Sequence, residues 1–234
     1  MPDRPDFDQW GDPLPKMRLS DTGVALIPIQ GAILKGASGS AKYFLSVTSY
    51  EDIGADIDAA LTGARAIVLL GKSGGGTITG APELSAKVAS IARSGYPILS
   101  YTEDQLCSSV EMITAGCTAR FATASAICGS IGVIWERLDT SKHLAGLGIS
   151  YNVFTSGKFK SYGRPHTELT DDQKDWLQSF VDARGAEFRD HMQAHRPRLP
   201  AEAMEGQIFT GHQAAKIGLI DATVSGLPEV LALL

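Results

Sequence analysis

The chain lacks a basic excess, a long apolar run and the marks of a targeting segment. Its formal net charge is −5, with 21 Lys and Arg against 26 Asp and Glu, and no run of basic residues breaks that balance. Because phosphate binding needs a basic face, this charge argues against nucleic acid as a partner. No apolar stretch approaches the roughly 20 residues that cross a bilayer, and the acidic, proline-rich start lacks the basic and apolar parts of a signal peptide. We therefore expect no membrane span and a cytoplasmic location.

Cysteine and clustered histidine are also scarce, which disfavours a metal centre. Cys107, Cys117 and Cys128 are an odd number and form no C-x-x-C pair, so we expect buried reduced thiols and no zinc site. His191 and His195 have the i, i+4 spacing of a metal pair, but no H-E-x-x-H glutamate or clear third ligand accompanies them. We therefore expect them on an exposed helix face, and we expect no metal and no cofactor.

What is present is an alternation of strands and helices in a chain of 234 residues, long enough for one large domain or a domain with an extension. Apolar runs predict strands at 24–29, 66–70, 97–101 and 149–154, and the Gly/Ser-rich residues 35–47 predict a loop. Ser49 can cap one helix, Pro82 opens a second, and Thr170 can cap a long third helix with acids in its first turn. This order is typical of an α/β fold with a parallel sheet, whose sites lie at the carboxyl ends of strands.

A glycine-rich segment stands at one such strand end. Residues 71–77 read Gly-Lys-Ser-Gly-Gly-Gly-Thr and follow the strand at 66–70. Successive glycines allow a sharp turn with bare N–H groups that can hold a phosphate or a developing oxyanion. The Gly-Lys-Ser part is like the end of a P-loop, but that motif needs a glycine at position 66, which is alanine. An oxyanion site is therefore favoured over nucleotide binding, and a merely structural tight turn is the alternative.

Ser108 follows the next strand and precedes a short helix. Most serines in that position are helix caps, and Ser109 competes with it as a nucleophile. A serine hydroxyl becomes nucleophilic only when a base takes its proton, and a lysine can be that base only if burial removes its charge. Residues 156–160, Ser-Gly-Lys-Phe-Lys, supply Lys158 and Lys160. None of the five histidines sits in a recognisable triad context.

These segments, in this order, resemble the signal peptide peptidase A (protease IV) family of Ser–Lys peptidases, within the Clp protease/crotonase superfamily. The resemblance covers about residues 23–225. Its short landmarks are matched at 72–76 (Lys-Ser-Gly-Gly-Gly), 107–110 (Cys-Ser-Ser-Val), 129–133 (Gly-Ser-Ile-Gly-Val), 156–160 and 209–214 (Phe-Thr-Gly-His-Gln-Ala). The subgroup it resembles most is that of the phage minor capsid protein C proteases, which likewise have Cys before the serine and lack a membrane anchor.

The resemblance implies specific roles for five residues, with a sixth as an alternative. Ser108 is the expected nucleophile and Lys160 the expected base, with Lys158 as the alternative base. The expected oxyanion donors are the N–H groups of Gly75 and Ser109, with Gly76 beside them as a further substrate-binding position.

The resemblance also implies an architecture and partners. We expect crotonase/Clp-like repeated β-β-α units with a mainly parallel sheet and flanking helices. The expected segments are an N-terminal arm at 1–22, a peptidase domain at 23–225 and a C-terminal helix or tail at 226–234. We expect a protein or peptide substrate in the host cytoplasm or procapsid, and a ring-like homo-oligomer in which one site can take its serine and lysine from neighbouring protomers.

Two segments depart from the family pattern, the glycine segment and the residues after Ser108. Lys72 replaces an Asp or Asn, Gly74 replaces a proline, and Ser109-Val110 replaces a pair of smaller residues after the nucleophile. These departures keep two alternatives open. One is a catalytically inert assembly protein of the same fold. The other is a crotonase-type acyl-CoA enzyme, which would use the oxyanion geometry without Ser108 or Lys160.

Overall fold

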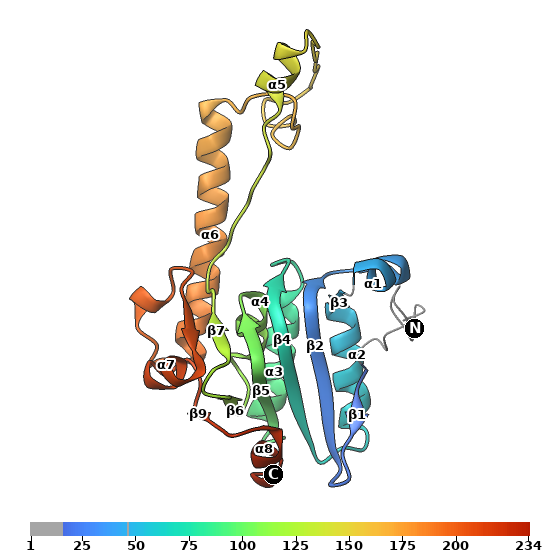
Figure 1. Ribbon diagram of the computed structural model, residues 1–234, viewed down its shortest axis with the longest axis vertical. Coiled ribbons are helices and arrows are strands. Elements are labelled where there is room, and N and C mark those ends of the chain that lie inside the picture. The colour runs from blue at the N-terminus through green and yellow to red at the C-terminus, as the bar shows by residue number, and fades with distance from the viewer. Residues whose placement is uncertain (1–15, 46) are drawn as a thin grey trace. The chain divides into compact units, whose positions relative to one another are not determined.

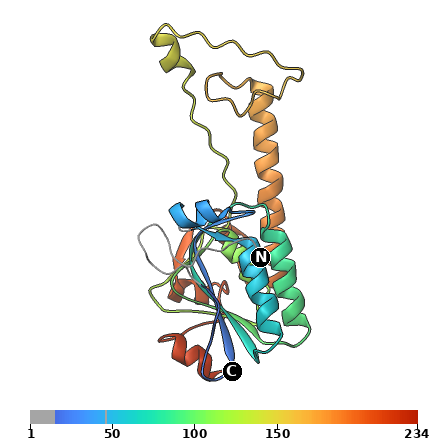
Figure 2. The ribbon, with the colours of Figure 1, turned by 90° about the vertical axis from the view of Figure 1, so that its right-hand side faces the viewer.

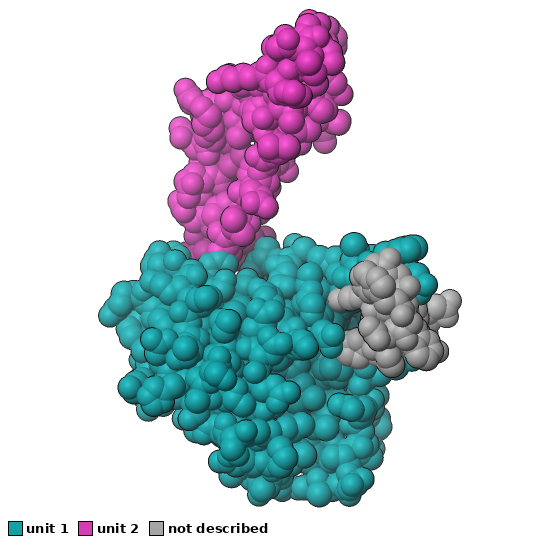
Figure 3. Space-filling view, in the orientation of Figure 1, with its two compact units in different colours: residues 1–132, 188–234 teal, residues 133–187 magenta. Residues whose placement is uncertain are grey.

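The computed structural model of the chain describes residues 16–45 and 47–234. These residues form two compact units (Figure 3). Unit 1 holds the described residues up to Gly132 together with Phe188–Leu234, and unit 2 is Val133–Glu187. Most of the arm expected at 1–22 lies outside the described residues, and the segment boundaries after residues 22 and 225 stay predictions.

One sheet in unit 1 joins the strands of the described residues, in the order β1-β2-β4-β5-β6-β9 (Figure 1). The bounds of these strands are β1 (Arg18–Leu19), β2 (Val24–Leu34), β4 (Ala66–Gly76), β5 (Ile98–Cys107), β6 (Ala119–Ala122) and β9 (Ala222–Thr223). All neighbours along this path pair in parallel except β1 and β2. Off the path, β3 (Thr48–Ser49) pairs with β2, and β7 (Ile127–Gly129) pairs with β5 and with β8 (Ile208–Thr210). The predicted α/β class with a mainly parallel sheet is confirmed.

Helices flank this sheet. Those wholly within unit 1 are α1 (Gly39–Leu45), α2 (Tyr50–Leu61), α3 (Ala81–Arg93), α4 (Ser109–Thr114), α7 (Gly211–Lys216) and α8 (Leu227–Ala232), with a 3₁₀ turn at Ala201–Ala203. Unit 2 contains α5 (Ser141–Gly146), and α6 (Asp171–His195) begins in unit 2 and ends in unit 1. The predicted caps are present. Ser49 accepts the Asp52 N–H at 3.1 Å, and Thr170 accepts the Gln173 N–H at 3.3 Å.

The two faces of the sheet are covered by different helices. Helices α2 and α3 lie side by side over one face (Figure 2). On the other face, Val24, Leu26 and Val68 pack in one cluster with Val230 of α8. Residues 66–69 are at most 1% exposed, as expected for a strand buried on both faces.

The sequence-based boundaries were wrong in several places: β2 ends at Leu34 and not at residue 29, and β5 ends at Cys107 and not at residue 101. Strand β4 continues through the glycine segment to Gly76, because β2 also runs on to Leu34 and pairs with it. Residues 39–45, predicted as part of a loop, form α1. Residues 149–154 are not a strand, because unit 2, all of whose residues are described, offers no strand to pair with them.

Candidate active site

Ser108 occupies a strained turn between the end of β5 and the start of α4. Its backbone has φ 54° and ψ −124°, in a region that residues other than glycine rarely adopt and that costs about 1–3 kcal/mol. Ser108 is the N-cap residue of α4, but its side chain makes no capping hydrogen bond. The capping role therefore does not account for this serine. A sharp strand-to-helix turn that projects a free hydroxyl is the geometry of a nucleophile elbow.

The glycine segment meets Ser108 at Gly75. Gly75 has φ +109°, and a Cβ built there would lie 2.5 Å from the Ser108 Cβ and 2.9 Å from its Oγ. No side chain fits in that space, so the Gly75 main chain stands directly against the serine hydroxyl. This contact joins the two strand ends, β4 and β5, that the sequence had suggested as one site.

Ser73 holds this segment in place, a role that the sequence analysis missed. The Ser73 hydroxyl donates to the Gly31 carbonyl at 2.6 Å and accepts the Gly75 N–H at 3.1 Å. An oxyanion beside Ser108 would compete with Ser73 for that N–H. A charged acceptor wins such a competition because charge-assisted hydrogen bonds are stronger than neutral ones. The only signal in the sequence was a hydroxyl residue just before three glycines.

The remaining two expected oxyanion residues differ in their surroundings. Ser109 is the first residue of α4, where helix N–H groups have no intrahelical acceptor, so its N–H is available beside Ser108. Gly76 faces β2 instead. A Cβ on Gly76 would lie 1.9 Å from the Ile33 carbonyl oxygen, so the close pairing of β2 and β4 accounts for glycine there.

The two candidate bases both lie in unit 2, in a turn before α6. The Lys158 ammonium donates to Asp172 at 2.9 Å, and the Lys158 carbonyl accepts the Gln173 side-chain amide at 2.6 Å. Lys160 is exposed, and its N–H donates to the Gly157 carbonyl at 3.0 Å. Within the described residues the Lys160 ammonium has no hydrogen-bond or ion-pair partner, whereas Lys158 is occupied by a carboxylate. This difference favours Lys160 as the base.

His191 and His195 do not lie on an exposed face, so that prediction was wrong. The His191 Nε2 lies 2.8 Å from the Ser85 hydroxyl and 3.0 Å from the Met112 carbonyl oxygen, and it joins α6 to α3 and α4. Burial lowers the pKa of both histidines. Ser85 is fully buried, so this Ser–His contact is a packing contact and not a nucleophile with its base. No group of three or more potential metal ligands occurs within the described part of the chain.

Cys107, the residue before Ser108, is unreactive at neutral pH. All three cysteines are buried and free, as predicted. Burial, together with the nearby Glu111 carboxylate, raises the pKa of the Cys107 thiol to about 12. Because the thiolate is the reactive form of cysteine, Cys107 is protonated at neutral pH and does not compete with Ser108 as a nucleophile.

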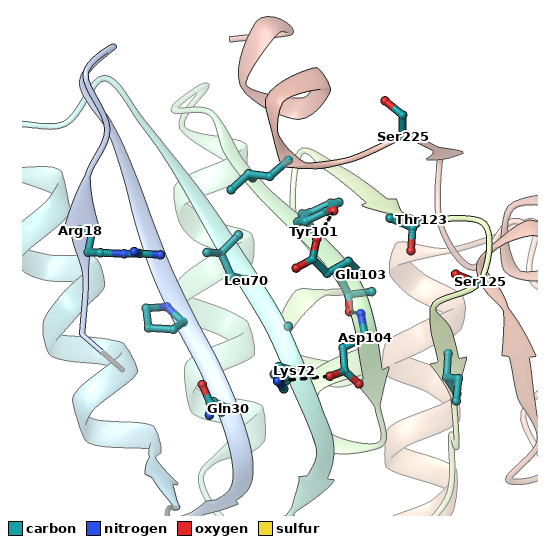
Figure 4. Close-up of a pocket in the computed structure, with 15 residues that line it drawn as sticks. Arg18, Gln30, Leu70, Lys72, Tyr101, Glu103, Asp104, Thr123, Ser125 and Ser225 are labelled. Atoms are coloured by element: carbon teal, nitrogen blue, oxygen red, sulfur yellow. Dashed lines mark hydrogen bonds and ion pairs between the residues drawn. The ribbon is translucent and has the colours of Figure 1, made fainter. Parts of the chain in front are cut away.

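An open pocket of about 1020 Å³ lies over the neighbouring strands β2, β4 and β5, and neither Ser108 nor Gly75 is among the residues that line it (Figure 4). Its wall includes Leu70 and Tyr101, with charged groups around them. Lys72 and Asp104 project from the adjacent strands and form an ion pair at 3.6 Å. Lys72, one of the departures from the family pattern, therefore belongs to this pocket wall and is paired with a carboxylate.

Comparison with known proteins finds a matching peptidase family model and similar proteases. The sequence model of peptidase family S49 matches residues 90–231. Capsid assembly protease C of Escherichia phage lambda is 26% identical over 212 residues, which are 89% of this chain and 48% of that protein. The chloroplastic serine protease SPPA of Arabidopsis thaliana is 25% identical over 173 residues, 72% of this chain and 25% of that protein. The chain thus spans about half of the first relative and a quarter of the second.

A solved structure shares the fold. A mutant of the 1510-N membrane-bound stomatin-specific protease aligns with a TM-score of 0.53 and 15% identity, over 92% of this chain and 85% of that one. At this identity the likeness concerns the fold alone, and it confirms the predicted Clp-like class.

Proposed function

Since this chain belongs to peptidase family S49, we propose that it is a serine endopeptidase in which Ser108 attacks the substrate carbonyl and Lys160 accepts the serine proton. The observation that carries the proposal is the meeting of Ser108 and Gly75. A strained, uncapped serine stands against a main-chain segment that only glycine can form. Such an arrangement puts a nucleophile and an N–H donor at one reacting carbon.

The proposed reaction has two halves. The Ser108 Oγ bonds to the peptide carbonyl carbon while its proton passes to the Lys160 Nζ, and the N–H groups of Gly75 and Ser109 hold the resulting oxyanion. The protonated lysine then gives its proton to the leaving amine. Water, deprotonated by the same lysine, hydrolyses the acyl-serine and regenerates the hydroxyl.

Replacing the two lysines separately tests the dyad. With Lys160→Ala, we expect the rate of Ser108 labelling by a fluorophosphonate probe to fall by about 10²–10⁴-fold, the usual contribution of a general base. The matched control is Lys158→Ala, which removes an exposed lysine that is paired with Asp172 and should leave labelling near the wild-type rate. Mass spectrometry of the labelled peptide identifies the modified residue.

Three results would contradict the proposal. Loss of labelling with Lys158→Ala but not with Lys160→Ala would move the base to Lys158. A label on a residue other than Ser108 would reject the nucleophile. No labelling and no cleavage of a denatured protein by the wild-type chain would favour the inert assembly protein.

We further propose that the active form is a homo-oligomer. Lys160 is exposed in the single chain, yet a lysine acts as a base only when it is desolvated, so a further surface must cover it. Unit 2 also exposes large apolar side chains: Phe154 is 93%, Ile134 81% and Leu138 76% exposed. Exposed apolar surface of this kind is typical of protein interfaces. A second copy of the chain would cover it.

The oligomer can be tested by light scattering at the protein concentration of the peptidase assay. We expect a mass that is a multiple of 24.8 kDa for the wild type. Phe154→Ser should lower both the mass and the activity, whereas Leu233→Ser, at a position 62% exposed in unit 1, should change neither. A fully active monomer would overturn the proposal.

The substrate is proposed from the relatives. The similarity to a protein named capsid assembly protease, over 89% of this chain, supports cleavage of capsid or scaffold proteins during phage head maturation, and protein or peptide degradation is the alternative. The proposed location is then the host cytoplasm or the procapsid. Within the described residues, no helix has both the length and the apolar composition needed to cross a membrane.

A further inference from the structure

We infer that Glu111 is a positioning residue for the nucleophile, acting through Gly129; the inference rests on the proposed role of Ser108. Three hydrogen bonds close a ring through these residues. The Glu111 Oε1 accepts the Gly129 N–H at 2.9 Å, and the Gly129 carbonyl accepts the Ser108 N–H at 2.9 Å. The Glu111 N–H completes the ring by donating to the Ser108 carbonyl at 2.8 Å.

The carboxylate in this ring is buried together with a cation. The side chains of Glu111 and Arg120 are 0% exposed and form an ion pair. Arg120 also donates to the Leu219 carbonyl at 2.9 Å. Replacing a buried ion pair by apolar residues of similar volume is often neutral or stabilising, so stability alone does not explain the pair. What the pair supplies at this place is a carboxylate oxygen that accepts the Gly129 N–H.

Gly129 is clamped from two sides. It has φ +119°, and a Cβ there would lie 2.5 Å from the Gln207 carbonyl oxygen. Gln207 therefore bounds Gly129 on one side, while Glu111 holds its N–H on the other. This clamp fixes the carbonyl that receives the Ser108 N–H.

The ring holds Ser108 in its strained conformation. Both main-chain polar groups of Ser108, the N–H and the C=O, are bonded within the ring. If Gly129 is released, Ser108 can relax towards ordinary φ values and carry its hydroxyl away from Gly75. Misplacing a reacting group by about 1 Å costs on the order of 10²-fold in rate. Glu111 thus contributes to the rate without touching the substrate.

Two double variants test this role. Glu111→Met/Arg120→Met removes the ion pair and the acceptor for Gly129. Glu111→Gln/Arg120→Met also removes both charges but retains a side-chain oxygen of nearly the same shape at position 111. We expect the Met/Met variant to lose about 10²-fold in kcat with KM unchanged, and the Gln/Met variant to recover most of that loss.

Two further readouts separate positioning from a merely structural role. Each double variant leaves one buried amide group unpaired, the Gly129 N–H in Met/Met and the new side-chain NH₂ at position 111 in Gln/Met, so the two should unfold at similar urea concentrations although Met/Met is the less active. Hydrogen exchange of the Ser108 amide should be faster in the Met/Met variant than in the wild type and the Gln/Met variant.

The outcomes are distinguishable from those for the proposed function. Wild-type kcat in the Met/Met variant, or equal losses in both variants, would overturn the inference while leaving the peptidase intact. If the wild type neither labels nor cleaves, the proposed function fails. The exchange of the Ser108 amide then still decides whether Glu111 holds this turn.

Discussion

Replacing Ser108 by alanine is expected to lower kcat for the hydrolysis of a denatured protein by about 10⁶-fold, the loss found when a serine protease loses its nucleophile. The hydroxyl makes no capping bond, so its removal should leave the fold intact. KM should change little, because the hydroxyl contributes to bond making and not to holding the extended substrate. Steady-state hydrolysis measures the fall in kcat, and fluorophosphonate labelling independently measures the loss of the reactive hydroxyl.

A matched serine serves as the control for this experiment. Ser179→Ala removes an exposed hydroxyl from α6 that, among the described residues, bonds only to the Trp176 carbonyl of its own helix. It should keep wild-type kcat and labelling. Residual hydrolysis by Ser108→Ala at more than about a hundredth of the wild-type rate would mean that another group attacks the substrate, because no oxyanion site alone supplies that rate.

Replacing Gly75 by alanine is expected to lower kcat by about 10⁴–10⁵-fold. The added Cβ would lie 2.5 Å from the Ser108 Cβ, and the main chain is at φ +109°, which alanine rarely adopts. The loop must therefore move, and two losses multiply. Removing one oxyanion donor costs about 10²–10³-fold, and displacing the nucleophile by about 1 Å costs about a further 10²-fold. Single-turnover acylation is the measurement, since it isolates the step that uses both groups.

The neighbouring glycine provides the control. A Cβ at Gly74 would meet only the Gln105 side-chain oxygen, at an ordinary contact distance of 3.7 Å. Gly74→Ala should therefore acylate within about two-fold of wild type, as for a surface change of about 0.5 kcal/mol. If Gly75→Ala acylates as fast as Gly74→Ala, the Gly75 N–H is not an oxyanion donor.

Local sequence patterns predicted most of the helices and strands, whereas pairing between distant strands decided where the strands end. The apolar run at 66–70 and the cap at Ser49 were visible because each depends on a few adjacent residues. The extension of β4 through the glycines was not, since it depends on the register with a strand 42 residues earlier, where Gln30 pairs with Lys72. Residues 149–154 have strand-like composition but pair with no strand in the part of the chain that the structure describes.

The sequence allowed the residues of the candidate site to be predicted, but not the buried residues that hold them in place. Ser108 and Gly75 could be singled out because each lies in a recognisable motif at a strand end, and the fold brings the two into contact. Glu111 and Arg120 looked like ordinary charged residues in the sequence. Their signal was their setting, a lone acid in the buried helix α4 and a lone base in the buried strand β6, and only the fold shows that the two meet.

The positive φ of Ser108 lowers the stability of the fold at the residue that is proposed to attack the substrate. Glycine would occupy φ 54° without the steric strain that serine bears there, so the proposed nucleophile also weakens the fold. Selection for thermal stability alone would therefore reward the loss of this serine. An engineered, more robust enzyme must gain its stability elsewhere, and directed evolution of this scaffold needs an activity screen at every round.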